Sequence, residues 1–228
     1  MVDILLGILA VVAGYLIGGF PSAYIVTKVV TNKDIRTIGT GHTGRGNVGT
    51  RNVFVNVGKI PGIVVAILDI LKGVFAVFLA RWLLDRSGLV ASDEHVAALF
   101  VLGAGLAAVI GHIWPVYIRF KGGAGLATSL GVLAVIMPQD LALALIIAIV
   151  LIFVTRNVLL SVNLSLISVP LWAWFHQYRW TLVVFPLVLL VIMFSHFLPN
   201  IIAEYKKAGS VRNLLAGLLL RNRTKARK

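Results

Sequence analysis

The chain has 228 residues, of which 59% are hydrophobic and 13% charged, and it carries a formal net charge of +13. It contains no cysteine, which excludes a disulfide framework, a thiol nucleophile and a cysteine-based metal site. The basic residues are not interleaved with base-stacking aromatics, so the positive charge is typical of the cytoplasmic loops of a membrane protein and not of nucleic-acid binding.

Seven apolar segments predict an all-α fold, a polytopic integral membrane helical bundle with about seven transmembrane helices. In chain order they cover residues 3–29, 61–84, 95–118, 126–137, 139–154, 157–175 and 180–203. The first is too long for a signal-peptide core and lacks a basic start, so we expect it to be retained as a span. The short connection between the fourth and fifth segments, residues 138–140, is consistent with either a long hairpin or a broken helix. We expect residues 1–205 to form the membrane domain and residues 206–228 a basic cytoplasmic tail.

The distribution of Lys and Arg predicts how the chain is oriented. The loops between successive segments lie alternately on the two sides of the membrane. The side of the first loop and the tail then carries 17 Lys and Arg residues, and the other side carries three, which are Arg81, Arg86 and Arg179. Cytoplasmic loops carry an excess of Lys and Arg. We therefore expect the N-terminus outside, the C-terminus in the cytoplasm, and the polar loops described next on the cytoplasmic face.

The loop after the first segment contains GTGHTGRGNVGTRNV, residues 39–53, with five glycines and two arginines. Backbone N–H groups of a glycine-rich loop, next to cationic side chains, are suited to phosphate. Arg45 and Arg51 would supply charge, and Asn47 and Asn52 would supply adaptable hydrogen bonds. The alternative is a solvated loop with ordinary cytoplasmic arginines.

A second glycine cluster, FKGGAGLATS at residues 120–129, leads directly into the fourth segment. Its N–H groups are therefore expected at a helix N-terminus, which favours anions, and Lys121 lies beside them. Thr128 and Ser129 would add hydroxyl donors in the first turn. The spacing is not that of a Walker A loop, and a flexible turn that permits tight helix packing is equally consistent with it.

Three of the ionisable residues in the apolar segments are candidates for function. Asp69 and Lys72 are three apart near the middle of the second segment, hence on one helical face. Charged groups at that depth are costly, so they indicate either a functional pair or a structural ion pair that faces the bundle. His112, shortly before a Trp-Pro pair, is either a proton shuttle or an interfacial polar anchor.

The sequence lacks the usual signatures of covalent catalysis. It has no G-x-S-x-G elbow, no H-x-x-x-x-D acyltransferase box and no carboxylate cluster for a metal, so we expect neither a metal nor another cofactor. A group transfer would then depend on an already activated donor, which the protein positions and whose charge it neutralises.

In their order along nearly the whole chain, these motifs resemble those of the bacterial acyl-phosphate:glycerol-3-phosphate acyltransferases (PlsY). The matching stretches are GGFPSAYIVTK (18–28), DIR (34–36), GRGNVGTRNV (44–53), LDILKG (68–73), GHIWPVYIRFKGGAGLATSLG (111–131) and TRNV (155–158). The corresponding family patterns are G-S-I-P-x-x-Y, D-x-R, G-S-G-N-x-G-A-T-N-V, D-x-L-K-G, GHxxPVxxxFKGGKGVAT and T-R-Y-V.

The resemblance implies a reaction and its location. The acyl chain of a long-chain acyl phosphate passes to the 1-hydroxyl of sn-glycerol 3-phosphate, giving lysophosphatidic acid and phosphate, the first step of phospholipid biosynthesis. The family implies a multi-pass protein among the lipids of the bacterial plasma (inner) membrane, with its active site facing the cytoplasm.

We accordingly expect three groups of site residues. Catalytic roles are expected for Asn47, Lys72, His112, Lys121 and Arg156. Phosphate binding is expected for Arg45, Gly46, Gly49, Arg51, Asn52, Gly122, Gly123, Gly125, Thr128, Ser129 and Asn200. A structural or substrate-orienting role is expected for Asp69 and Arg36.

Several positions depart from the family pattern: Arg45 replaces a serine, Arg51 a threonine, Ala124 the second lysine of KGGKG, and Leu159 the serine after T-R-Y-V. The two gained arginines could preserve the cationic charge of the lost lysine. One alternative is a homologue that binds phospholipid or an anionic metabolite without catalysis. A small transporter is a third interpretation, in which the buried Asp–Lys pair would mark the only midplane path.

Overall fold

The computed structural model describes residues 2–39, 47–89, 93–176 and 179–210, and within these ranges it contains helices, turns and loops but no strand. The predicted all-helical fold is confirmed. The chain forms two compact units, Met1–Met137 and Pro138–Lys228. The expectation of a single membrane domain over residues 1–205 stays a prediction.

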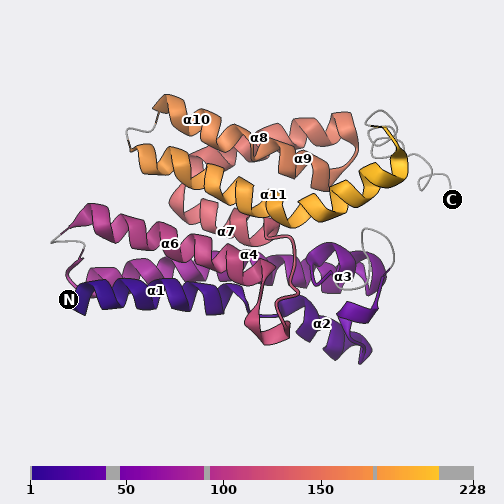
Figure 1. Ribbon diagram of the computed structural model, residues 1–228, viewed down its shortest axis with the longest axis horizontal. Helices are drawn as coiled ribbons and strands as arrows, with labels where there is room; N and C mark the ends of the chain where they lie inside the picture. The colour runs from indigo at the N-terminus through magenta and orange to yellow at the C-terminus, as the bar shows by residue number, and fades with distance from the viewer. Residues whose placement is uncertain (1, 40–46, 90–92, 177–178, 211–228) are drawn as a thin grey trace. The chain divides into compact units, whose positions relative to one another are not determined.

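Three long helices form the centre of the first unit, and Figure 1 shows them side by side: α1 (Val2–Gly18), α4 (Lys59–Arg86) and α6 (Glu94–Ile113). A shorter helix, α7 (Leu126–Ile136), packs against α4. The remaining elements are α2 (Ser22–Thr31), the 3-10 turn η1 (Ile35–Thr37), α3 (Thr50–Asn56) and the 3-10 turn η3 (Val116–Ile118). Of these, η1 and α3 each contact α2, and the three elements gather at one end of the unit (Figure 1).

Glycines allow these helices to approach one another at backbone distance. A Cβ at Gly18 of α1 would collide with the Ala108 carbonyl oxygen of α6, and a Cβ at Gly73 of α4 would collide with the Thr128 carbonyl oxygen of α7. Lipid tails are as apolar as leucine side chains, so membrane helices associate through close van der Waals packing rather than through hydrophobic burial. The small residues therefore fix the spacing of the helices that carry the candidate site.

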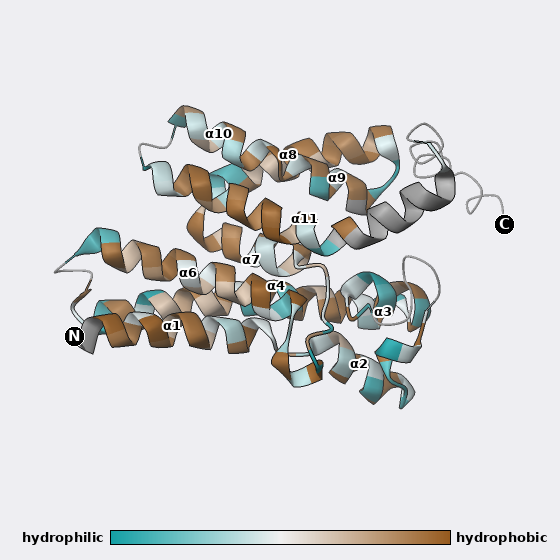
Figure 2. Cartoon of the chain, in the orientation of Figure 1, coloured by the Kyte–Doolittle hydropathy of each residue, from teal (hydrophilic) through white to brown (hydrophobic). Residues whose placement is uncertain are grey.

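Within the described residues, four helical stretches are long and apolar enough to cross a membrane: Ile4–Thr31, Lys59–Arg86, Glu94–Ile118 and Pro138–Thr155. Shorter apolar helices cover Leu126–Ile136 and Trp180–His196. Figure 2 shows hydrophobic residues along α1 and α6 and hydrophilic residues around α2 and α3. The chain is thus a multi-pass membrane protein, whereas the expected seven spans and the orientation of the termini stay predictions.

The first predicted segment is interrupted in the structure. Helix α1 ends at Gly18 and α2 begins at Ser22, with Pro21 as the N-cap residue of α2. Proline has no N–H to continue the helical hydrogen bonds, and it fits well at a helix start. The interruption brings Phe20 and Ser22 beside the middle of α4, as described below.

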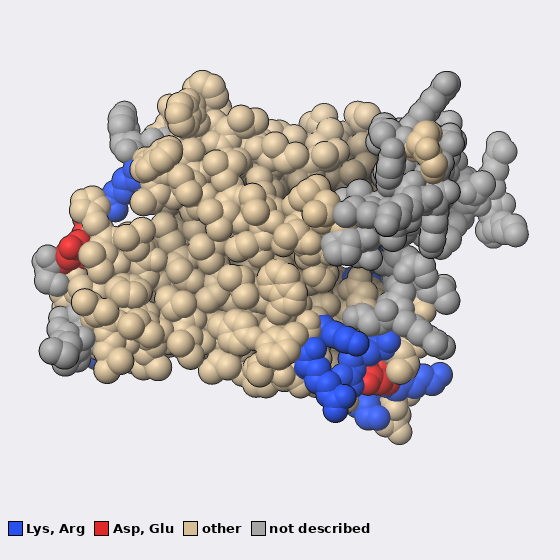
Figure 3. All heavy atoms as spheres, in the orientation of Figure 1, with Lys and Arg blue, Asp and Glu red and all other residues tan. Residues whose placement is uncertain are grey.

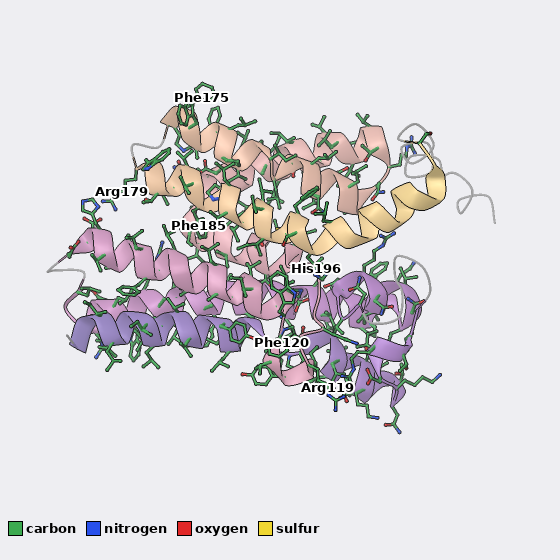
Figure 4. All side chains as sticks on the ribbon, in the orientation of Figure 1. Arg119, Phe120, Phe175, Arg179, Phe185 and His196 are labelled. Carbon is green, nitrogen blue, oxygen red and sulfur yellow. The ribbon has the colours of Figure 1, made fainter. Side chains whose placement is uncertain are left out.

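The second unit consists of α8 (Pro138–Thr155), α9 (Val158–Ser165), α10 (Ser168–His176) and α11 (Trp180–Ala208). Helix α8 begins two residues after α7 ends, so the chain changes helix at the predicted short connection. The predicted sixth segment forms α9 and α10, and at the break between them the hydroxyls of Ser165 and Ser168 donate to backbone carbonyls three residues earlier. Phe175 lies near the end of α10, Arg179 directly precedes α11, and Phe185 and His196 lie along α11 (Figure 4).

Candidate active site

A cluster of three ionisable side chains is buried in the first unit. Asp69 and Lys72 of α4 and His112 of α6 are 1%, 7% and 6% exposed. The Lys72 Nζ lies 2.9 Å from Asp69 Oδ1, and His112 Nδ1 lies 3.7 Å from the same oxygen. Buried charges of this kind persist only when they are paired. The structure therefore joins two of the residues predicted to be catalytic, Lys72 and His112, to the predicted orienting residue Asp69.

Two hydroxyl groups from other helices complete the contacts of the Asp69 carboxylate. The Ser22 hydroxyl donates to Oδ1 at 2.5 Å, and the Thr50 hydroxyl donates to Oδ2 at 3.3 Å. Ser22 is the first residue of α2 and Thr50 the first of α3. The sequence reasoning missed both residues, and only the GFPS turn and the helix start at Gly-Thr hinted at special positions there.

Lys72 lies where two hollows of different character meet. A small polar cavity of about 10 Å³ is lined by Lys72, Ser22, His112 and Gly122, among others. A larger apolar groove of about 830 Å³ is lined by Lys72 together with residues of α1, α4 and η3. The Lys72 ammonium also donates to the Phe20 carbonyl oxygen at 3.2 Å, and Phe20 lines both hollows. Lys72 thus borders both hollows, while its ammonium contacts Asp69 and the Phe20 carbonyl.

The apolar groove extends from Lys72 along α4. Its lining includes Leu71, Phe75 and Phe78 of α4, each more than half exposed, and Leu16 of α1. Six residues separate Lys72 from Phe78, which corresponds to about 9 Å along the helix axis. The volume lies within the usual range of ligand sites, about 300–1,000 Å³. The groove therefore has the size and the apolar lining that an alkyl chain requires.

The two predicted phosphate loops are joined to each other. The Val48 N–H donates to the Gly122 carbonyl oxygen at 3.2 Å. Asn52, fully buried, donates through Nδ2 to the carbonyl oxygens of Asn47 at 2.8 Å and Ile38 at 3.3 Å. In the structure Asn52 thus fixes the first loop from inside, and its predicted contact with phosphate stays a prediction.

The second loop lies directly against the imidazole of His112. The Gly122 and Gly123 N–H groups donate to the carbonyl oxygens of Ile113 and His112, both at 3.1 Å. A Cβ at Gly123 would collide with His112 Nε2, so only glycine fits at this position without displacement. Gly125 has φ +81° and is the N-cap residue of α7, a left-handed conformation that glycine adopts without strain.

The remaining first-unit predictions differ in how close they come to the cluster. Gly49 lies near Gly123, with 3.7 Å between an ideal Cβ of Gly49 and the Gly123 Cα. Lys121 and Arg51 are exposed. Thr128 and Ser129 are fully buried within α7. Their roles in substrate binding stay predictions.

Arg36 contacts an acid within its own turn. Its guanidinium donates to both carboxylate oxygens of Asp34, with Nη2 at 2.6 Å from Oδ2, and it lies over the Tyr24 ring. The hydrogen bond from Arg36 holds the pKa of the Asp34 carboxyl below its ordinary value. This pair belongs to a basic surface around α2, visible in Figure 3, that also includes the exposed Lys28 and Lys33.

Other predicted residues cannot be related to this cluster. Arg45 and Gly46 lie outside the described residues. Arg156, with φ 54°, and Asn200 belong to the second unit, and the Asn200 side chain lies outside the described part of α11. Arg119 and Phe120, labelled in Figure 4, precede Lys121 and have φ 59° each, an uncommon conformation for two successive residues that carry side chains.

Comparison with known proteins places the chain in a family. The family model described as glycerol-3-phosphate acyltransferase matches residues 8–207. Glycerol-3-phosphate acyltransferase 2 of Dehalococcoides mccartyi is 36% identical over 210 residues, which make up 92% of each chain. The glycerol-3-phosphate acyltransferase of Halalkalibacterium halodurans is 41% identical over 169 residues, 74% of this chain and 73% of the relative.

Solved structures agree with the sequence comparison. The crystal structure of PlsY (YgiH), an integral membrane glycerol 3-phosphate acyltransferase, in its glycerol 3-phosphate form has a TM-score of 0.72 and 28% identity, covering 89% of this chain and 92% of that one. The lysophosphatidic acid form of that protein gives a TM-score of 0.69 at 27% identity with the same coverage. Since the family model spans most of the chain and the Dehalococcoides mccartyi relative aligns over 92% of its length, this chain is an acyltransferase and belongs to the glycerol-3-phosphate acyltransferase family.

Proposed function

We propose that the protein transfers the acyl group of a long-chain acyl phosphate to the 1-hydroxyl of sn-glycerol 3-phosphate, releasing inorganic phosphate and lysophosphatidic acid. The observation that carries this proposal is the position of Lys72, which lines both the apolar groove and the polar cavity beside His112. In the proposed complex the apolar chain of the donor lies in the groove, and its anionic head lies near the Lys72 ammonium. The relatives that match over the whole chain are named as glycerol-3-phosphate acyltransferases, which supports the acceptor.

The described residues support a direct transfer. In the proposed reaction the hydroxyl oxygen of the acceptor forms a bond to the carbonyl carbon, the bond from that carbon to the phosphate oxygen breaks, and phosphate leaves. A mixed anhydride has a good leaving group, so no covalent enzyme intermediate is required. The Lys72 ammonium is placed to balance negative charge on the attacked carbonyl, as preorganised donors do. His112 is the candidate base for the hydroxyl proton.

The glycine loops are the proposed binding sites for the two phosphate groups. The hydrogen bond between Val48 and Gly122 holds the two loops together, so a ligand of one loop lies near the other. Lys121 is exposed on the second loop, where its ammonium can reach a phosphate oxygen. A charge-assisted hydrogen bond of this kind contributes about 1.5–3 kcal/mol.

A donor-exchange assay tests the reaction. Purified protein in detergent micelles is given sn-glycerol 3-phosphate with palmitoyl phosphate or with palmitoyl-CoA, and both phosphate and lysophosphatidic acid are measured. We expect product only with palmitoyl phosphate, in equal amounts with phosphate, and a large loss for Lys72→Met. Product from palmitoyl-CoA alone would overturn the proposed donor. Absence of product from either donor would favour the homologue that binds anionic ligands without catalysis.

We also place the enzyme in the bacterial plasma (inner) membrane with its active site facing the cytoplasm. The support is the distribution of 17 basic residues against three between the two sets of loops, together with the multi-pass character of the chain. Fusions at the C-terminus to a reporter that is active only after export, and to one that is active only in the cytoplasm, test the orientation. An active exported reporter at Lys228 contradicts it.

A further inference from the structure

The Asp69 carboxylate is contacted by side chains from four elements of the first unit, of which Lys72, Ser22 and Thr50 are within hydrogen-bond distance and His112 Nδ1 lies 3.7 Å away. Lys72 belongs to the same helix, His112 approaches from α6, and the hydroxyls of Ser22 and Thr50 arrive from the starts of α2 and α3. Each of the two hydroxyls contacts a different oxygen of the carboxylate. The carboxylate is therefore held from both sides.

This arrangement restricts the rotation of the carboxylate. The terminal torsion of an aspartate is broad, so a carboxylate with donors on one side only can turn. Ser22 donates to Oδ1 and Thr50 to Oδ2, so the plane of the carboxylate is fixed. The orientation of Oδ1 toward the Lys72 ammonium and the His112 imidazole is then fixed as well. The two hydroxyls thus orient the Lys72 ammonium and the His112 imidazole through Asp69, although neither hydroxyl is itself charged.

Thr50 is a feature of this chain rather than of the family motif. In the pattern G-S-G-N-x-G-A-T-N-V the residue at this position is alanine, and the threonine follows it. Here the threonine comes one residue earlier, and exposed Arg51 stands at the motif's threonine position. The first residue of α3 is the one that reaches Asp69, so the change of position gives the carboxylate a second hydroxyl donor.

We infer that Ser22 and Thr50 are positioning residues for acyl transfer, which act through Asp69 to hold Lys72 and His112 in their working orientation. The inference rests on the proposed function, because it assigns the two hydroxyls to that reaction. It predicts a loss in turnover rather than in substrate affinity, since both hydroxyls donate to the Asp69 carboxylate.

The test compares variants that remove a hydroxyl with variants that keep one. Ser22→Ala should lower kcat about ten-fold, as expected for a hydrogen bond to a charged group. Thr50→Val should lower kcat less, because its hydrogen bond is longer, and Thr50→Ser should restore most of the activity. KM for both substrates should change little. In the double variant Ser22→Ala/Thr50→Val the two effects should be coupled, because the residues share one carboxylate.

Thr27→Val provides the matched control. Thr27 lies five residues after Ser22 on α2, its side chain is fully buried, and it takes no part in the contacts of Asp69. The pH profile of kcat should shift for Ser22→Ala, because the orientation of Asp69, Lys72 and His112 changes, and should stay that of the wild type for Thr27→Val. Thermal stability of each variant is measured alongside.

The outcomes separate the inference from the proposed function. A wild-type protein without activity overturns the proposed function. An active wild type whose turnover and pH profile are unaffected by Ser22→Ala and Thr50→Val overturns the inference alone. A loss of stability in Ser22→Ala with an unchanged pH profile, equal to the effect of Thr27→Val, also overturns it, because the hydroxyl would then serve only the fold.

Discussion

The buried ion pair of Asp69 and Lys72 leads to a prediction in which stability and activity respond differently. Changing Asp69 to Asn removes the negative charge and leaves an ammonium that is only 7% exposed. Breaking a buried pair in this way typically costs about 3–5 kcal/mol, because the remaining charge has no partner. Replacing Lys72 by Met as well removes that charge, and an apolar side chain of similar length fills its place. We expect Asp69→Asn/Lys72→Met to regain most of the lost stability.

Activity should not return with stability in the double variant. We expect both Asp69→Asn and Asp69→Asn/Lys72→Met to release little lysophosphatidic acid, because neither retains an oriented cation at the junction of the groove and the cavity. The measurements are thermal unfolding of the purified protein in detergent and product formation with both substrates. An Asp69→Asn variant as stable as the wild type would show that the pair is not tightly coupled. A double variant with full turnover would refute the role of Lys72.

Three further predictions concern the second loop, the groove and the surface acid. Gly123→Ala should lower kcat about ten-fold, since its Cβ would displace the His112 imidazole, whereas Gly103→Ala, whose Cβ would meet only the Val11 Cγ2 at 3.2 Å, should be nearly neutral. Leu71→Trp should raise KM for the acyl donor only, and Ile63→Trp, equally exposed but outside the groove, should not. Asp34→Asn should cost about 0.2–1 kcal/mol at pH 7. Because the pKa of Asp34 is lowered, that difference should disappear as the pH falls through the pKa of the folded state, as unfolding curves between pH 7 and pH 3 would show.

The helices were predictable from the sequence because long apolar runs have few other structures available in a membrane. The interruptions within the runs were harder to predict. The break before Ser22 has a local signal, Gly-Gly-Phe-Pro, which marks a helix boundary. The break between α9 and α10 has none of comparable strength, because serine hydroxyls that bond to the backbone only weakly oppose helix formation.

The candidate site was also predictable only in part from the sequence. Asp69 and Lys72 could be paired from their spacing, since residues three apart share a helical face. Ser22 and Thr50 are 47 and 19 residues from Asp69 in the sequence, and only the packing of α2 and α3 against α4 brings their hydroxyls to its carboxylate. Arg36 could have been paired with Asp34 two residues away, whereas the motif alone predicts only a structural or substrate-orienting role for it.

Most of the side chains that line the groove along α1 and α4 are exposed, so the acyl chain proposed to bind there would contact the bilayer. A donor bound there arrives by two-dimensional diffusion within the leaflet, while the glycerol 3-phosphate arrives from water. The concentration that sets the rate for the donor is then its mole fraction in the membrane. Diluting the donor with inert lipid should slow the reaction even when its total amount is constant, a behaviour known from interfacial enzymes. Such an enzyme would sense how much activated fatty acid the membrane already holds.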